Sequence, residues 1–470
     1  MADVPVPGEE LTPDAGPPVD ASPALPAAVQ KLLDRLWSAG HAAYVVGGSV
    51  RDTMLGRVPT DWDLTTSALP DETAALFPEA AYENAFGSVN VPSGDASIGD
   101  VDITTMRSDH EYADFRRPHR VEFSDSIELD LARRDFTVNA IAWGAEAGGT
   151  PNLVDPHGGR EDLVARTLRA VGDPLTRFGE DALRMLRAVR LAATLGFTIE
   201  PATLAAIRDR AELVRHLSGE RIATEMRLLL ASDAPSTGLR LLADTGLLDH
   251  LAPELAAQRG VAQNKVPGED LWDHTVRSVD GAAKDPGHLR LAALLHDLGK
   301  PSTMADGRFV GHERVGADLA RVLLDRWHWP VAERERVAHL IRHHMFGYVP
   351  RWSDAAVRRF IVKVGPDSLD ELFLLREADN RGSGLPTDAG RLTELRSRVA
   401  VQLDSGAALE LRSLAVDGTD LMTEFGWQPG PIVGETLQRL LDRVIGDPTL
   451  NTRDRLLSLA RSMRSAGPGS

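Results

Sequence analysis

Two aspartates two residues apart, Asp61 and Asp63, are the side chains of this sequence best suited to holding a magnesium ion. If their segment is a strand, its two-residue period places both carboxylates on one face. Mg²⁺ prefers oxygen ligands and is usually bound together with substrate phosphates. Two such ions would support transfer of a nucleotidyl group. The same spacing also occurs on solvated strand faces and in turns, so the neighbouring residues must decide between these interpretations.

A glycine turn just before this pair favours the chemical interpretation. The apolar run 43–46 predicts a buried strand. Gly47 and Gly48 then let the backbone turn tightly and come close to a ligand. A short helix over about 49–55 should follow, whose first N–H groups attract an anion, and Arg51 should reach the same anion. Strand, turn, helix and strand in this order are typical of a nucleotide-binding site.

Asp102 could add a third carboxylate. Alternation along the segment 101–107 buries Val101 and Ile103 and turns Asp102 to the opposite face. An exposed strand aspartate fits this pattern at least as well. The polar and charged stretch that follows, 108–120, predicts a flexible loop.

The segment 133–140 is a second motif, with two arginines beside an aspartate and an asparagine. Arg134 and Asp135 could hold triphosphate oxygens and ribose hydroxyls. A doubled arginine before an apolar helix is also a common solvated cap, so both interpretations stay open at this point.

The segment 178–190 is a third motif, in which Asp181 and Arg184 stand one helical turn apart. On a continuous helix they would face the same way, and Arg187 and Arg190 would continue their line. A carboxylate beside a guanidinium can accept from the amine of C or A and donate to the adjacent ring nitrogen. The alternative is an exposed ion pair worth about a few tenths of a kcal/mol.

These three motifs, in this order, resemble those of the DNA polymerase β-like nucleotidyltransferases, and more narrowly the bacterial class II CCA-adding enzyme and poly(A) polymerase family. The resemblance implies that Asp61 and Asp63 are catalytic and hold two Mg²⁺ ions. It implies CTP and ATP as substrates, selected without a nucleic-acid template, and the tRNA 3′ end as acceptor. The nucleotide-binding residues that it implies are Gly47, Gly48, Arg51, Arg134, Asp135, Asp181, Arg184, Arg187 and Arg190.

A second constellation, in the later half of the chain, resembles the HD-domain metal phosphohydrolases. Its residues are His274, His296, Asp297, His312, His343 and Asp379. Imidazole and carboxylate ligands suit Mn, Fe, Ni or Zn. A single buried histidine is usually structural, whereas several in this order on successive helices favour one metal site. In the resembling family an HD domain can follow the nucleotidyltransferase head, and some such domains have lost hydrolytic activity.

Composition limits the remaining possibilities. The net charge of −17 over 470 residues argues against indiscriminate nucleic-acid binding, although not against one shaped RNA. The absence of cysteine excludes disulfides and thiolate metal sites. No apolar run is long enough for a membrane helix, and the acidic start lacks the basic region of a secretory signal. A cytoplasmic location without membrane contact is therefore expected.

The expected fold is an α+β head, a small mixed sheet with helices, followed by an all-α neck and body that contains an HD domain. The neck is mildly basic, with nine arginines against seven carboxylates over 174–230. The predicted limits are 1–24 for a disordered acidic tail, 25–165 for the head, 166–265 for a neck that binds the base and tRNA, 266–400 for the HD domain and 401–470 for a helical C-terminal body and tail.

Three functions compete on this evidence. The favoured one is template-independent addition and repair of the tRNA CCA end with CTP and ATP. Within the same class, the chain could be a poly(A) polymerase or add only CC or only A. From another class, it could be an HD phosphohydrolase with an inactive head. The residues that argue against an inactive head are all present: Asp61, Asp63, Arg134, Asp181 and Arg184.

Overall fold

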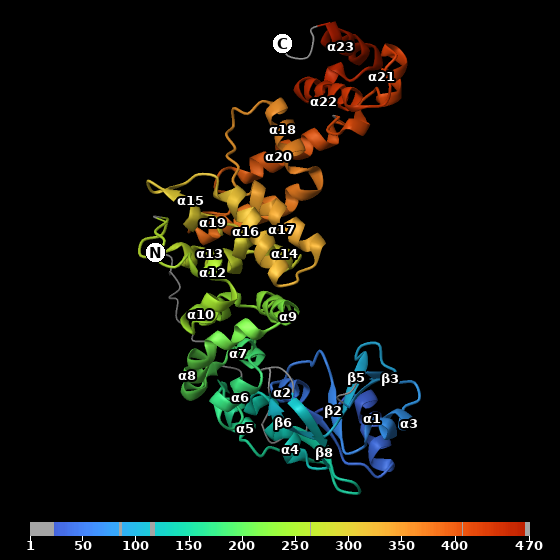
Figure 1. Ribbon diagram of the computed structural model, residues 1–470, viewed down its shortest axis with the longest axis vertical. Coiled ribbons are helices and arrows are strands. Elements are labelled where there is room, and N and C mark those ends of the chain that lie inside the picture. Colours follow the sequence, from blue (N-terminus) through green and yellow to red (C-terminus); the bar gives the residue numbers. More distant parts are fainter. Residues whose placement is uncertain (1–22, 84–86, 113–117, 264, 407, 466–470) are drawn as a thin grey trace, which may run out of the picture. The chain divides into compact units, whose positions relative to one another are not determined.

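The computed structural model describes residues 23–83, 87–112, 118–263, 265–406 and 408–465. The chain divides into two compact units, 1–251 and 252–470 (Figure 1). The predicted disordered tail, 1–24, lies almost wholly outside the described residues, so it stays a prediction, as do the finer domain limits. None of the helices described is both long and apolar enough to cross a bilayer.

A seven-stranded mixed sheet forms the centre of the first unit, in the order β3-β4-β5-β2-β1-β8-β9. Strands β2 and β5 run parallel, and the other neighbours are antiparallel. All four residues of β1 are buried, as its apolar run predicts. The mixed sheet expected for the head is confirmed. The strands are β1 (Ala43–Val46), β2 (Asp63–Thr66), β3 (Ala81–Glu83), β4 (Ser88–Pro92), β5 (Asp100–Thr105), β8 (Ala142–Ala145) and β9 (Asn152–Val154).

Short helices surround this sheet and build its core. Side chains of β1 on one face, Tyr44 and Val46, pack with Met106 and with Ile127 and Leu131 of α4. The helix after the glycine turn spans Gly48–Met54, close to its predicted range. The helices of the head are α1 (Ala27–Ser38), α2 (Gly48–Met54), α3 (Pro70–Leu76) and α4 (Ile127–Ala132), with a 3₁₀ turn at Thr137–Asn139.

The predicted flexible loop 108–120 is wrong where the structure describes it. Strands β6 (Arg107–Tyr112) and β7 (Pro118–Phe123) pair in an antiparallel hairpin apart from the main sheet. The charged sequence of this hairpin lacks the apolar alternation from which a half-buried strand is recognised. Residues 113–117 lie outside the described part of the chain.

The rest of the first unit is helical, apart from the short parallel pair β10 (Thr167–Leu168) and β11 (Thr198–Ile199). The helix predicted through the third motif is interrupted, because Asp181 is extended and its carboxylate accepts a hydrogen bond from Leu183 N. This local cap ends one helix and starts the next. The helices are α5 (Gly159–Val164), α6 (Pro174–Glu180), α7 (Leu183–Leu195), α8 (Pro201–Arg210), α9 (Gly219–Leu230), α10 (Pro235–Asp244) and α11 (Leu247–Leu251).

The second unit is helical, with one small hairpin of β12 (Met304–Ala305) and β13 (Arg308–Phe309). Helix α14 is buried from Leu289 to Leu295, so it carries the residues that follow it into the core. The helices are α12 (Pro253–Ala256), α13 (Leu271–Gly281), α14 (His288–Leu295), α15 (Lys300–Thr303), α16 (His312–Arg326), α17 (Val331–His343), α18 (Asp354–Val364), α19 (Leu369–Gly382), α20 (Leu392–Asp404), α21 (Gly418–Phe425), α22 (Pro431–Gly446) and α23 (Arg453–Ser465).

Candidate active site and metal centre

The glycine turn, Asp63 and Arg134 lie together at one end of the first strands. Gly47 has a φ of +77°, a backbone conformation that residues with a side chain rarely adopt. Val46, the residue before it on β1, is the register partner of Asp63 on β2. A Cβ on Gly47 would lie 2.9 Å from Arg134 Nη1 and 3.9 Å from Asp63 Oδ2. Only glycine therefore fits between the carboxylate and the guanidinium.

The carboxylates of the head are arranged around Asp63. Asp63 and Asp102 are register partners on the parallel strands β2 and β5, so their side chains share a face, and Asp61 lies two residues before the start of β2. Asp102 also accepts a hydrogen bond from Asn90 at 2.9 Å. Desolvation raises the pKa of Asp63; Arg134 opposes the rise, and the like charges of Asp102 and Asp61 add to it. Such a set of mutually repelling carboxylates suits a divalent cation.

Asp130 orients the guanidinium groups of the second motif. Its carboxylate is fully buried and contacts Arg133 at 2.8 Å and Arg134 at 3.1 Å. Burial opposes ionisation of Asp130, but the two arginines outweigh it and hold its pKa below the ordinary value. The sequence analysis missed Asp130, whose spacing of three and four residues before the arginine pair was the available signal.

The guanidinium of Arg51 lies at the glycine turn, where a Cβ on Gly48 would be 3.4 Å from Arg51 Nη2. Its guanidinium forms a two-pronged ion pair with Asp52, at 2.8 and 2.9 Å, and donates to Asn139 Oδ1 at 2.6 Å. These bonds tie α2 to the 3₁₀ turn of the second motif. In this structure Arg51 binds protein acceptors beside the turn, and its contact with an anion stays a prediction.

The second and third motifs are joined by a network of charges that is buried except for Arg187. Arg187 Nε donates to Asp135 Oδ2 at 2.7 Å, and Arg190 Nε donates to Glu225 of α9 at 2.6 Å. Burial opposes ionisation of Asp135, but Arg187 and the hydrogen bond from Asn139 hold its pKa well below the ordinary value. The network fixes the start of α7 against the head.

Asp181 and Arg184 point to different partners. Asp181 Oδ2 accepts from Arg221 of α9 at 2.7 Å. Arg184 contacts Glu180 at 2.5 Å and also donates to the backbone oxygens of Arg177 and Arg133, at 3.0 and 2.8 Å. The simple ion pair between Asp181 and Arg184 is therefore wrong, because the chain breaks its helix between α6 and α7. Arg221 was not predicted as a site residue.

Replacing Asp135 with asparagine should lower the free energy of unfolding by about 1–3 kcal/mol near neutral pH, because the buried group then no longer offers a charged partner to the partly exposed Arg187. The folded pKa of Asp135 is depressed, so its contribution is present above the ordinary pKa of about 3.9 and is lost as pH falls through the folded pKa. The difference in the free energy of unfolding between wild type and Asp135→Asn should therefore become smaller in acid. Urea titrations at several pH values measure it, with the exposed Asp100→Asn as control; a gap independent of pH would contradict the assignment.

Four histidines of the second unit turn the same ring nitrogen toward one another. His296, His312 and His344 each place Nδ1 2.7 Å from a backbone carbonyl, so each Nδ1 carries the proton and Nε2 carries a lone pair. The Nε2 atoms of His274 and His296 are 3.1 Å apart, and those of His312 and His344 are 3.3 Å apart. Lone pairs facing at these distances repel unless a cation or a proton lies between them. The donor set therefore fits a metal ion.

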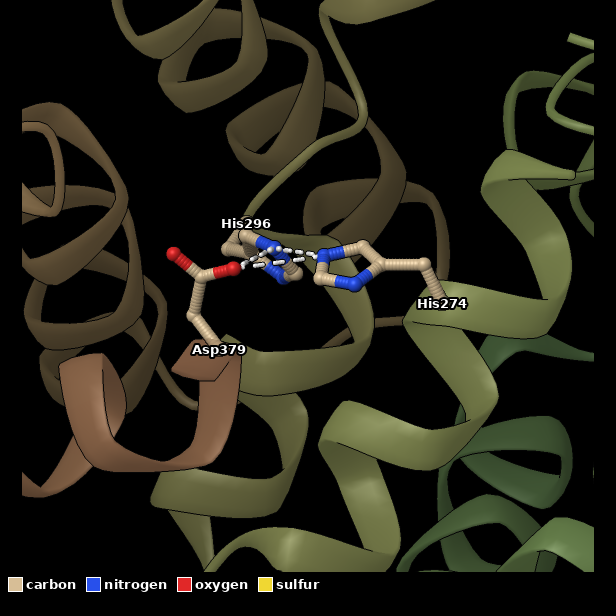
Figure 2. Close-up of side chains that lie close together, drawn as sticks. All are labelled: His274, His296 and Asp379. Carbon is tan, nitrogen blue, oxygen red and sulfur yellow. Dashed lines mark hydrogen bonds and ion pairs between the residues drawn. The ribbon is translucent and has the colours of Figure 1, made fainter. Parts of the chain in front are cut away.

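The cluster consists of two triads, and the Asp297 carboxylate of the second triad lies between them. The first triad is His274, His296 and Asp379, shown in Figure 2, and the second triad is Asp297, His312 and His344. Asp297 Oδ2 lies 3.3 Å from His274 Nε2 and 3.1 Å from His296 Nε2. Its other oxygen, Oδ1, lies 3.3 Å from His312 Nε2 and 3.7 Å from His344 Nε2. The sequence had suggested one metal site, whereas the geometry provides two.

His343 lies outside both triads, and His344 takes the place predicted for it. The His343 ring packs on His339 with a centroid distance of 4.6 Å. Burial, with added repulsion from His339 and neighbouring cations, lowers its pKa to about 4. A helical signal could have separated the two histidines, because His344 continues the buried stripe of Val337 and Ile341.

Two lysines that the sequence analysis did not single out reach the first triad. Lys300 Nζ donates to Asp297 Oδ2 at 2.6 Å and is buried. Lys265 Nζ lies 3.4 Å from Asp379 Oδ1. Burial lowers the pKa of Lys300, although Asp297 counteracts this.

Three family models match the chain in sequence order. They are the Poly A polymerase head domain at residues 43–169, the Probable RNA and SrmB- binding site of polymerase A at 196–259, and the HD domain at 267–381. The second unit thus contains the HD match, and the Asp63 site lies in the head match.

Known relatives match almost the whole length. The CCA-adding enzyme of Geobacillus stearothermophilus is 44% identical over 429 residues, covering 90% of this chain and 94% of the relative. That of Streptococcus suis (strain 05ZYH33) is 32% identical over 435 residues, covering 92% and 95%. The solved Bacillus stearothermophilus CCA-adding enzyme in complex with CTP has a TM-score of 0.68 at 30% identity, covering 94% of this chain and 99% of that chain. This chain belongs to the family of bacterial CCA-adding enzymes.

Proposed function

We propose that the chain adds and repairs the 3′-terminal CCA of tRNA, using CTP and ATP without a template. The observation that carries the proposal is the convergence of Asp63, the Gly47 turn and Arg134, with Asp102 in register on the next strand. This site lies in a chain whose relatives are CCA-adding enzymes over nine-tenths of their length. The proposal places the activity in the cytoplasm.

The terminal ribose 3′-hydroxyl of the RNA would attack the α-phosphate of the nucleotide, and pyrophosphate would leave. Asp61 and Asp63 would hold two Mg²⁺ ions, which lower the pKa of the hydroxyl and stabilise the leaving group. The bare backbone of Gly47-Gly48 leaves room for the triphosphate, and Arg134 supplies positive charge beside it.

Recognition of the base is assigned to the start of α7. Asp181 offers an acceptor that Arg221 holds in place, and Arg184 offers donors from a buried guanidinium. Arg187 keeps over a third of its side chain exposed while its Nε is bound to Asp135, so its remaining donors can reach a base or phosphate.

Extension assays on purified protein test this proposal against poly(A) synthesis. A tRNA lacking CCA should gain residues only when CTP is present and reach full length only when CTP and ATP are both supplied. A tRNA ending in CC should need ATP alone. Extension of an unrelated RNA with ATP alone would favour a poly(A) polymerase instead.

We also propose that the HD cluster binds transition-metal ions and hydrolyses phosphoesters. The observation that favours this second activity is the convergence of four Nε2 atoms on the Asp297 carboxylate. Ni, Mn, Fe or Zn fits such a donor set, and when bound the metal would activate water for attack on phosphorus.

The two activities should be separable. His296→Ala combined with Asp297→Ala should leave CTP and ATP incorporation near wild type, since both residues belong to the second unit. Phosphatase or cyclic phosphodiesterase activity measured with Ni²⁺ or Mn²⁺ should disappear, whereas His343→Ala, outside the triads, should retain it. A wild type that binds no metal and hydrolyses nothing would make the cluster purely structural.

A further inference from the structure

We infer that the HD cluster binds two metal ions in a fixed order, the second triad first, because Lys265 and Lys300 contact the carboxylate oxygens of Asp379 and Asp297 that face the histidines of the first triad. This inference rests on the proposed metal binding of the cluster. An ion that enters the first triad must displace the Lys265 ammonium group from Asp379.

The two halves of the cluster differ in the charges that face them. Lys300 contacts Asp297 Oδ2 at 2.6 Å, the oxygen that also faces His274 and His296. Lys265 lies 3.4 Å from Asp379 Oδ1, the oxygen that lies 3.3 Å from His274 Nε2. Each ammonium group therefore occupies a position beside an oxygen that a metal ion would need.

Further charges increase this difference. Arg376 contacts Asp379 Oδ2 at 3.1 Å, which adds a third cation to the first triad. The second triad has a carboxylate nearby instead, because Glu313 lies 3.8 Å from His312 Nδ1. The three cations offset the attraction of Asp297 and Asp379 for a divalent ion at the first triad, whereas Glu313 adds to the attraction at the second.

Lys265 lies on a connector whose two ends are fixed by hydrogen bonds. Asp270 caps α13 and accepts a hydrogen bond from Gly260 N at 2.7 Å, and Leu271 N donates to Val261 O at 2.8 Å. Between these bonds the chain extends Gln263 and Lys265 toward the cluster, where Gln263 accepts from Lys300 at 3.3 Å.

The two lysines differ in how easily they can move aside. The Lys265 side chain is 33% exposed, whereas that of Lys300 is 8% exposed. Lys265 can therefore swing into solvent when an ion enters, while Lys300 stays beside Asp297. Removing Lys265 should tighten binding to the first triad without disturbing the core.

Calorimetric titration of the chelator-treated full-length protein with Ni²⁺ tests the order of filling. The wild type should bind two ions in two separable steps. Lys265→Met should tighten the weaker step by about tenfold and leave the tighter step unchanged, since the lost charge faces one triad. Lys363→Met, which removes an exposed charge outside the cluster, should alter neither step.

Two further variants assign the steps to the triads. His344→Ala should remove the tighter step, and His274→Ala should remove the weaker one, with melting curves confirming that both variants fold. Loss of the tighter step in His274→Ala would overturn the inference, as would equal effects of Lys265→Met and Lys363→Met. Complete absence of Ni²⁺ binding would overturn it together with the metal assignment, while CCA addition by the head would be untouched.

Discussion

Replacing Asp63 with alanine is expected to abolish nucleotide transfer while the protein stays folded. The carboxylate lies at the meeting point of the Gly47 turn and Arg134, and it is the register partner of Asp102. Its loss removes an inner ligand of the proposed ions, which contribute several kcal/mol to the transition state. A loss of about 4 kcal/mol corresponds to a rate roughly a thousandfold lower. Asp61→Ala should act in the same way.

The measurement is incorporation of labelled CTP into tRNA lacking CCA, followed under single-turnover conditions so that chemistry is observed. Asp100→Ala is the matched control, because Asp100 begins the same strand as Asp102 and is exposed. It should keep wild-type activity. Substantial incorporation by a folded Asp61→Ala, Asp63→Ala double variant would refute the catalytic assignment.

The second large effect is expected on the choice of nucleotide. Asp181→Asn should relax the rejection of UTP, because the amide can donate to the O4 of uracil where the carboxylate can only accept. Unpaired polar groups in such a pocket cost about 1–3 kcal/mol each, so discrimination should fall by roughly tenfold to a hundredfold. Asparagine can preserve the hydrogen bond from Leu183 N, so α7 should begin at the same residue.

Two further variants separate base recognition from structural roles. Arg221→Gln breaks the contact with Asp181 but keeps the carboxylate, so CTP and ATP should still be preferred. Arg184→Lys keeps a charge beside Glu180 but removes the planar donor edge, so incorporation should fall for both nucleotides. The quantity to compare is kcat/KM for all four nucleotides. Unchanged preference in both Asp181→Asn and Arg184→Lys would limit these residues to holding the helices together.

Local patterns were sufficient to predict the centre of the head. The apolar run 43–46 is a strand buried at every position, and the doubled glycine forms a turn in which the position of Gly47 has no room for a side chain. The resemblance supplied the rest of the α+β head and the helical HD-containing body, both now confirmed. The position of Asp102 beside Asp63 could not be predicted from the pattern of one strand, because it depends on the parallel pairing of β2 with β5.

The partners of the charged side chains could not be predicted from spacing. Asp181 and Arg184 are three residues apart, but the cap at Asp181 breaks the helix and sends the two side chains to different neighbours. His343 and His344 are neighbours in the sequence, and only His344 extends the buried face of α17. The position of the Asp297 carboxylate between the triads and the approach of Lys265 depend on how five helices and a connector pack.

Intact mass measurement of the reaction product tests the central claim most directly. A tRNA lacking CCA is incubated with the protein, Mg²⁺ and all four nucleotides, and the product is weighed. The proposed function predicts one product, heavier by two cytidylates and one adenylate, with no further growth on longer incubation. A ladder of adenylates, a product that stops at CC, or an unchanged RNA would contradict it.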